Sequence, residues 1–431
     1  MEEFTHPDVQ ACSYLLSKAE TPSDAVRAWV LLQKKHPNLS AMVALSDYEQ
    51  SALPASIKKY VAEPHGCLVP YFSSEKIYFL DDDLLTTMFT SGDFRFNIDY
   101  TLMFDTNVAS YVNKLVRGER LGEIQARIVS LVDDLLHDDL NFDHIFYMAE
   151  NVKNVLTQIE RSNSSQLRFW RSLNKGFRRN LVSLQIFRSI DCQEYKRTLN
   201  PKPRLTYRQA VRNAAAFSYD FYASDAGKDH ILNFVLVQRI ILLQLIGMVR
   251  IQLSSNKGTR SKLAEYTAYV NDVVGAYFDR EAIVAHKYFD DRNSVRILGK
   301  VQKGCSKTRL LKRLDNIAWD MATPRFMEKL LVSLGQGRYF IPLLLTFDSA
   351  LRELLSLYPV KGVIFDRERG AYLPLPEVIT REYFGTNGCL DLIENLHSEE
   401  VRSERLSRPK QTRESVRRLI RREYKLLRSL I

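Results

Sequence analysis

Two aspartates stand where short apolar runs of the chain end. Asp105 lies near the end of Asn97–Asn107 (NIDYTLMFDTN), and Asp348 directly follows Tyr339–Phe347 (YFIPLLLTF). Carboxylate oxygens are the ligands that Mg²⁺ and Mn²⁺ prefer in proteins. If the two runs are parallel strands side by side, both carboxylates lie at the sheet edge where open α/β sheets bind ligands. Asp105 and Asp348 are therefore the strongest candidates for a metal site.

A metal cluster needs further carboxylates, and three helical segments can supply them. Glu150 lies in the apolar and aromatic segment FDHIFYMAENVKN, where a carboxylate is costly to bury without a partner. Asp320 lies between Trp319 and Met321 in a mostly apolar run, with Asp315 one turn earlier as a reserve. A second reserve lies in the segment REAIVAHKYFDD, namely Glu281.

Each main candidate also has a structural alternative. Asp105 and Asp348 could simply cap the helices that follow them, because Asp is a favoured N-cap residue. Glu150 could form an ion pair with an arginine in the core. Asp320 could pair with basic residues of its own helix, which are Arg325 and Lys329.

The apolar periodicity of the sequence predicts the strands and helices that must position these acids. Strands are predicted at Asn97–Asn107 and Tyr339–Phe347, with a third at Val360–Phe365. Between and after them the pattern predicts helices at Ala109–Val116, Leu121–Leu136, Phe142–Glu160, Tyr207–Tyr222, Asp229–Leu253, Arg260–Tyr277, Arg280–Tyr288, Lys307–Leu334 and Ala350–Tyr358. Strands alternating with helices favour an open, parallel α/β sheet in which the first strand and the late strand are neighbours.

The ordered motifs MFDTN, FYMAENVKN, NIAWDMATPRF and LLLTFDSAL resemble the spaced acidic motifs of PIN-domain nucleases. The resemblance covers roughly residues 97–365. It implies that one or two divalent cations are held by four acids, which are Asp105, Glu150, Asp320 and Asp348. It also implies that Asn107 and Thr346 fix the carboxylates through hydrogen bonds.

The resemblance further implies a PIN-like three-layer α/β fold with a small parallel sheet and extensive helical insertions. The chain has 431 residues, more than one core usually supports. We therefore expect a small mixed α/β region at 1–95 and a nuclease domain at 96–366 with a helical insertion at about 160–300. Residues 367–431 are expected to form an extension with a basic helix.

The function expected from this resemblance is metal-dependent cleavage of phosphodiester bonds by an endonuclease, with RNA preferred over DNA as substrate. Mg²⁺ or Mn²⁺ held by the carboxylates would activate water and neutralise charge on the scissile phosphate. A role as a toxin or a defence nuclease would fit. The alternative is a non-catalytic nucleic-acid-binding protein or a helical adaptor.

Positive charge supports a polyanionic partner, since 61 Lys and Arg against 51 Asp and Glu give a net charge of +10. Basic stretches at 168–179, 300–313 and 407–428 could carry nucleic acid or form solvated faces. The residues proposed to bind nucleic acid are Arg168, Trp170, Arg171, Lys175, Arg178, Arg179, Lys307 and Arg309. The last stretch predicts a basic helix with an apolar stripe that could bind nucleic acid, a protein partner or inhibitor, or an acidic membrane surface, or pack on its own domain.

Several other classes of protein lack support in the sequence. No P-loop, GxGxxG, GxSxG or HExxH motif occurs, which disfavours nucleotide-binding, serine-hydrolase and zincin chemistry. The five cysteines form no CxxC pair and the amino terminus has no secretory pattern, so a cytoplasmic protein is expected. The apolar stretch Ile231–Ile251 contains Gln238, Arg239 and Arg250, and it is interpreted as a core helix rather than a membrane span.

Overall fold

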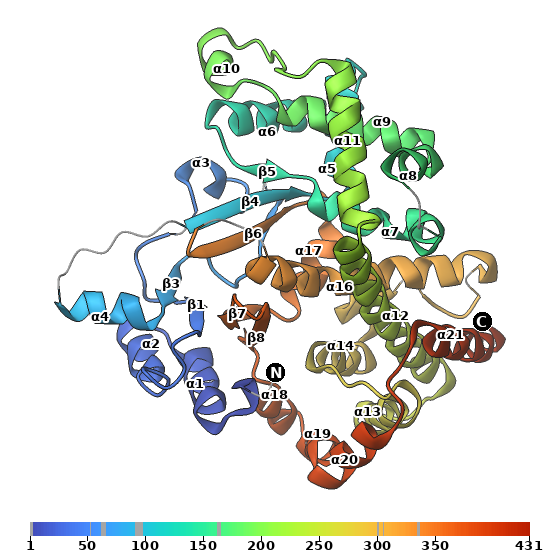
Figure 1. Cartoon of the computed structure of the whole chain (residues 1–431). Coiled ribbons are helices and arrows are strands. Elements are labelled where there is room, and N and C mark those ends of the chain that lie inside the picture. The colour runs from blue at the N-terminus through green and yellow to red at the C-terminus, as the bar shows by residue number, and fades with distance from the viewer. Residues whose placement is uncertain are drawn as a thin grey trace.

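The computed structural model describes residues 3–51, 53–61, 66–90, 98–161, 165–299, 301–304, 306–333 and 337–431. It shows a mixed α/β protein in which helices surround two small sheets (Figure 1). The helices that follow the central strands lie above and beside the first sheet, and the second sheet lies nearer the amino terminus.

The first sheet has four strands in the order β2-β6-β4-β5. These are β2 (Leu68–Pro70), β6 (Tyr339–Leu345), β4 (Ile98–Phe104) and β5 (Phe142–Asp143). Strand β4 pairs in parallel with both β6 and β5, whereas β2 runs antiparallel to β6. Phe104 lies opposite Leu345, so β4 and β6 end level with each other. The prediction that the first and the late strand are parallel neighbours is confirmed.

The second sheet is antiparallel, in the order β3-β1-β7-β8. Its strands are β3 (Ile77–Leu80), β1 (Ser40–Ala44), β7 (Val360–Asp366) and β8 (Ala371–Pro376). The third predicted strand is therefore present as β7, but it belongs to this sheet and not to the sheet of β4 and β6. Periodicity identifies a buried strand without identifying the strand it pairs with.

Strand pairing crosses the predicted boundary between residues 1–95 and the rest of the chain in both sheets. Strand β2 completes the first sheet beside β6, and strands β1 and β3 belong to the second sheet beside β7. The boundary predicted after residue 366 falls between β7 and β8, which are paired strands. The boundary at residue 95 itself lies outside the described residues.

Helices make up most of the described chain. Their bounds are α1 (Pro7–Lys18), α2 (Pro22–Trp29), α3 (Ala55–Lys58), α4 (Asp82–Thr90), α5 (Thr106–Val116), α6 (Gln125–His137), α7 (Ile145–Glu160), α8 (Gln166–Ser172), α9 (Lys175–Arg188), α10 (Cys192–Thr198), α11 (Tyr207–Tyr222), α12 (Asp225–Ser254), α13 (Thr259–Tyr269), α14 (Asp279–Asp290), α15 (Arg296–Gly299), α16 (Lys307–Ser333), α17 (Ser349–Ser356), α18 (Thr380–Thr386), α19 (Leu390–His397), α20 (Glu399–Ser407) and α21 (Arg413–Ser429).

Two predicted helix boundaries are wrong for identifiable reasons. The helix predicted from Phe142 begins only at Ile145, because Phe142 and Asp143 pair with β4 as strand β5. The Asp143 carboxylate accepts a hydrogen bond from the Ile145 backbone N–H at 2.8 Å. The helix predicted to reach Tyr277 ends at Tyr269 and continues as a short π-helical turn that stops at Gly275, whose φ is +70°.

Helix α12 is the one helix among the described residues that is long and apolar enough to cross a membrane by length and composition. Of its most apolar window, 61% is buried inside the protein. Its polar side chains have partners within the fold: Gln238 and Arg239 bond Asp315, and Arg250 pairs with Glu423. The most apolar part of α12 is therefore mostly covered by other parts of the protein.

Helix α16 links the two main cores of the protein. Its amino-terminal half shares a core with α12, α13 and α14, and its carboxyl-terminal half packs against β6 in the core of the first sheet. Asp320 lies where the two cores meet, because Ala318 belongs to one core and Trp319 to the other. The helix that carries a predicted site residue is thus fixed on both sides.

Candidate metal centre

The level ends of β4 and β6 bring Asp105 and Asp348 together through Thr346. The Asp105 backbone N–H donates to the Leu345 carbonyl at 3.1 Å. The fully buried Thr346 hydroxyl bonds the Asp105 carboxylate and accepts from the Asp348 backbone N–H at 3.0 Å. Thr346 therefore bonds the carboxylate of Asp105, as the resemblance implies, but it contacts Asp348 only through the Asp348 backbone N–H.

Asp105 and Asp348 are both helix caps as well. Asp105 Oδ1 accepts from the Val108 N–H at 2.6 Å, at the start of α5. Asp348 Oδ1 accepts from the backbone N–H groups of Ala350 and Leu351 at 2.9 and 3.2 Å, at the start of α17. The capping alternative is thus correct for both residues. It does not exclude metal binding, because in Asp348 it uses Oδ1 and leaves Oδ2 without a hydrogen bond to any described residue.

Glu150 reaches the same place from α7. Its carboxylate accepts from the backbone N–H and the hydroxyl of Thr106, at 2.7 and 2.5 Å, and Thr106 is the residue after Asp105. The predicted arginine partner is not found among the described residues. The cation that acts on Glu150 is Lys153, one turn further along α7.

Asp320 is brought beside Glu150 by the packing of α16 on α7. Lys153 Nζ donates to Asn316 Oδ1 at 3.3 Å, and these two residues lie one turn from Glu150 and Asp320 respectively. The suggested pairing of Asp320 with its own helix is wrong for Arg325, which bonds a different carboxylate. Asp320 forms no hydrogen bond or ion pair with any residue that the structure describes.

The four carboxyl groups act on one another electrostatically. Burial, then the Glu150 carboxylate, raises the pKa of Asp105 to about 7. Burial, then the Glu150 and Asp348 carboxylates, raises the pKa of Asp320 to about 8. Burial also raises the pKa of Glu150, and the Thr106 hydrogen bonds and the Lys153 charge only partly offset this. Such a group of acids is costly to ionise without additional positive charge.

The ligand oxygens of the four acids do not form a tight group. Among the described residues, no three of these four acids have ligand oxygens that all lie within 4.8 Å of one another. Mg²⁺ commonly binds through one or two carboxylates and keeps several water ligands. Carboxylates are the donors that a hard divalent cation takes, but no three of these acids lie close enough in this structure to share one through their oxygens.

The reserve candidates and Asn107 do not join the cluster. Asp315 is bonded to Arg239 and Gln238, and the fully buried Glu281 forms a two-point ion pair with Arg325. Asn107 has an exposed side chain, and it is its backbone N–H that bonds Asp105. Asn107 therefore supports the site through its backbone rather than its amide.

Two residues that are not among the predicted site residues also contribute to the site. Thr106 anchors Glu150, and Lys153 balances part of its charge. The position of Lys153, three residues after Glu150 on a helix, is a detectable signal because such residues share a face. Nothing in the sequence indicates that Thr106 reaches a residue of α7.

The basic stretch 168–179 does not provide a stacking surface. Phe169, Trp170 and Phe177 are buried, so their rings are not available to nucleic-acid bases. Arg178 lies over the Trp170 ring at 5.9 Å. The cations that remain exposed are Arg168, Arg171, Lys175 and Arg179.

The basic start of α16 is further from the carboxylates than expected. Lys307 and Arg309 are exposed, but thirteen residues of helix separate Lys307 from Asp320. At a rise of 1.5 Å per residue this is roughly 20 Å. These cations are therefore outside the metal cluster.

A second group of potential ligands lies near the amino terminus. Atoms of His6, Asp8 and His36 lie within 4.8 Å of one another. Asp8 is already bonded to Lys35 at 2.8 Å, and His6 Nδ1 accepts from the Asp8 backbone N–H at 3.3 Å. Among the described residues this group meets the distance for sharing an ion, and it lies at the surface with His6 exposed and Asp8 and His36 half-buried.

No protein-family model, curated protein or solved structure matches this chain. The chemistry of the site is therefore argued from its geometry.

Proposed function

We propose that this protein is a metal-dependent endonuclease that cleaves phosphodiester bonds, with RNA preferred over DNA. The observation that carries the proposal is the convergence of four acids from distant segments at the ends of two parallel strands. Thr346 joins Asp105 to Asp348, and Thr106 joins Glu150 to the same strand end. Asp320 completes the group, and among the described residues only the Lys153 charge is recorded as offsetting part of its raised pKa.

The donor set suits Mg²⁺ or Mn²⁺. Carboxylates are hard oxygen ligands, and the raised pKa values of Asp105 and Asp320 reflect a site that favours added positive charge. A bound divalent cation supplies Lewis-acid activation and charge neutralisation at the phosphate. In this proposal Asp105 and Asp348 hold the cation, while Glu150 and Asp320 complete its shell or orient water.

A PIN-like architecture is part of the same proposal. Its support is the parallel arrangement of β5, β4 and β6 with acids beyond the strand ends, in the motif order noted from the sequence. The helices between Glu150 and Asp320 would then be an elaboration of that fold. The proposal covers the first sheet and its helices, and leaves the second sheet without a catalytic role.

The proposal is tested with the Asp105→Asn variant, because Asn caps helices as well as Asp does and the fold is retained. We expect wild-type protein to cleave labelled single-stranded RNA with Mg²⁺ or Mn²⁺ but not with EDTA. The variant should lose activity by on the order of 10²- to 10³-fold. It should also bind Mn²⁺ more weakly, measured by calorimetry.

Asp191→Asn is the matched control. Asp191 caps α10 through the N–H groups of Gln193 and Glu194, outside the cluster, so this variant should cleave normally. RNA binding without cleavage by the wild type would replace the nuclease proposal with a non-catalytic binding protein.

A further inference from the structure

Helix α21 presents an exposed face made of cations. Arg417, Arg418, Arg421, Lys425 and Arg428 are exposed and pair with no acid among the described residues. Their spacing of three and four residues places them on the same half of the helix. Glu414 is the only exposed acid of α21, so this face is strongly positive.

The opposite face of α21 is fixed to the protein. Val416, Ile420 and Leu427 are buried in the core that α12 shares. Glu423, which is 2% exposed, pairs with Arg422 at 3.0 Å and with Arg250 of α12 at 3.5 Å. Most of the apolar stripe predicted from the sequence is thus buried against the protein. The cationic face stays exposed and can bind a partner.

Contacts place α21 at the far end of the two helices that carry Glu150 and Asp320. Arg413 pairs with Glu160, the last residue of α7, at 3.5 Å. The Tyr424 hydroxyl donates to the carbonyl of Lys307, the first residue of α16, at 3.0 Å. Lys153 of α7 bonds Asn316 of α16, and Phe146 of α7 contacts Phe326 of α16, so the two helices run in opposite directions and both lead from α21 toward the carboxylates.

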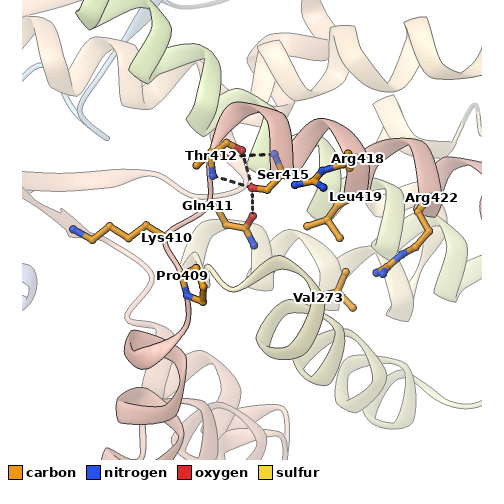
Figure 2. A pocket seen from close by; sticks show the side chains of 9 residues that line it. All are labelled: Val273, Pro409, Lys410, Gln411, Thr412, Ser415, Arg418, Leu419 and Arg422. Carbon is orange, nitrogen blue, oxygen red and sulfur yellow. Dashed lines mark hydrogen bonds between the residues drawn. The ribbon is translucent and has the colours of Figure 1, made fainter.

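The first turn of α21 also borders a groove of about 630 Å³ (Figure 2). Lys410, Arg418 and Arg422 line it together with the hydroxyl groups of Thr412 and Ser415. Ser415 Oγ donates to Gln411 Oε1 at 2.8 Å, which orders the floor of the groove. The Lys410 and Arg418 cations of this groove suit phosphate oxygens, whereas the Thr412 and Ser415 hydroxyls are already used in capping α21.

We infer that the cationic face of α21 and its groove bind the phosphate backbone of the nucleic acid whose cleavage occurs at the four acids. This inference rests on the proposed function. A membrane is a poorer occupant because Leu426 is the only large apolar side chain that is exposed on α21, and interfacial helices need an apolar face. Contacts to phosphates alone read no base sequence, so binding at α21 is independent of sequence.

The separation of the two sites sets a minimum substrate length. Ten residues of α7 separate Glu150 from Glu160, roughly 15 Å, and the α16 path is roughly 20 Å. At about 3.4 Å per nucleotide along one strand, the span corresponds to about four to six nucleotides. Shorter oligonucleotides can reach the carboxylates without touching α21.

The test is the triple variant Arg417→Gln, Arg421→Gln, Lys425→Gln, which alters only exposed side chains. Binding of a labelled 30-nucleotide RNA is measured in EDTA at several KCl concentrations, so that no cleavage occurs. Loss of three phosphate contacts should lower the salt-dependence slope by about 2 and weaken binding about 10- to 100-fold at 0.1 M salt. In Mn²⁺ the variant should cleave the 30-mer with a higher KM and cleave a trinucleotide as the wild type does.

The matched control removes the same charge elsewhere, with Arg27→Gln, Lys58→Gln and Lys196→Gln on α2, α3 and α10. All three residues are exposed, and this variant should bind and cleave as the wild type does.

Unchanged RNA affinity and salt slope in the α21 variant would overturn the inference while leaving the nuclease proposal intact. Weakened binding by a protein that never cleaves would support the α21 surface and reject the nuclease. If RNA binding is unchanged and sedimentation with anionic lipid vesicles is lost instead, α21 is a membrane-binding helix and the inference is wrong.

Discussion

The carboxyl groups of Asp105 and Asp320 make the stability of the folded protein depend on pH. Their pKa values are raised from 3.8 to about 7 and about 8. Above pH 3.8 the folded protein therefore keeps protons that the unfolded chain has lost. The free energy of unfolding contributed by these groups is fully present below that pH and falls as the pH rises toward 8.

Asp320→Asn should therefore stabilise the metal-free protein in alkaline solution. We expect its free energy of unfolding to exceed that of the wild type by about 1 to 3 kcal/mol at about pH 8.5, and by less at about pH 5.5. Urea unfolding in EDTA at both pH values measures the difference. Adding Mn²⁺ should stabilise the wild type more than the variant, because only binding to the folded state stabilises it. A gain that does not depend on pH would show that Asp320 titrates normally.

At the scale of single residues, the sequence identified the acids but not their surroundings. Asp105 and Asp348 were recognisable because a carboxylate directly after a buried strand is uncommon in a core and suited to a cap or a ligand. The structure shows the capping role for both. The bond from Thr106 to Glu150 could not be foreseen, since it depends on how α7 packs against the end of β4.

Helix α16 carries a candidate ligand on one side and a buried ion pair on another. Asp320 is close enough to Glu150 of α7 to interact with it electrostatically, whereas Arg325, five residues later, bonds Glu281 of α14 at 2.8 Å. Glu281 is 0% exposed, so its charge depends on that partner. The ion pair joins α16 to α14.

Glu281→Ala should destabilise the protein by about 3 to 5 kcal/mol, because it leaves the Arg325 guanidinium buried without its partner. Replacing both residues, as Glu281→Met with Arg325→Met, should recover most of that loss. Urea unfolding measures both effects. Mn²⁺ affinity of the double variant should match the wild type, and a tenfold loss would instead identify Glu281 as a metal ligand.

At the scale of elements, long periodic helices were predicted well and short elements were not. Helix α11 has the predicted bounds, and α16 begins where predicted, since many turns of apolar repeat define each one. Strand β5 has two residues, too few for any period, so the sequence pattern predicts the start of a helix there. Strand β7 was found, but its partners β1 and β8 were not, because pairing depends on the whole fold.

The amino-terminal region is required by both sheets. It contributes β2 to one sheet and β1 and β3 to the other, and their apolar side chains belong to the cores on either side. The sequence predicts residues 1–95 as a separate region. Met42 in fact pairs with Val363, and no local sequence pattern indicates this pairing. Pairing over such separations leaves no trace in composition or periodicity.

Removing residues 1–90 should therefore abolish folding of the remainder. Strands β6 and β7 would lose a paired neighbour each, leaving backbone groups unbonded and apolar surface exposed. We expect fragment 91–431 to show no cooperative thermal transition by circular dichroism, and co-expression with fragment 1–90 to restore one. A sharp transition in the isolated fragment would show that the boundary at residue 95 separates real folding units.

The parallel pairing of β4 with β6 has a consequence for synthesis of the chain. Asp105 leaves the ribosome early, whereas Asp348 follows after more than two hundred further residues, which takes roughly 10 to 50 s at ordinary elongation rates. During that interval β4 lacks its main neighbour, and closing so long a loop is slow. The carboxylates cannot assemble before Asp348 has left the ribosome, so the messenger RNA being translated is not exposed to the proposed activity until then.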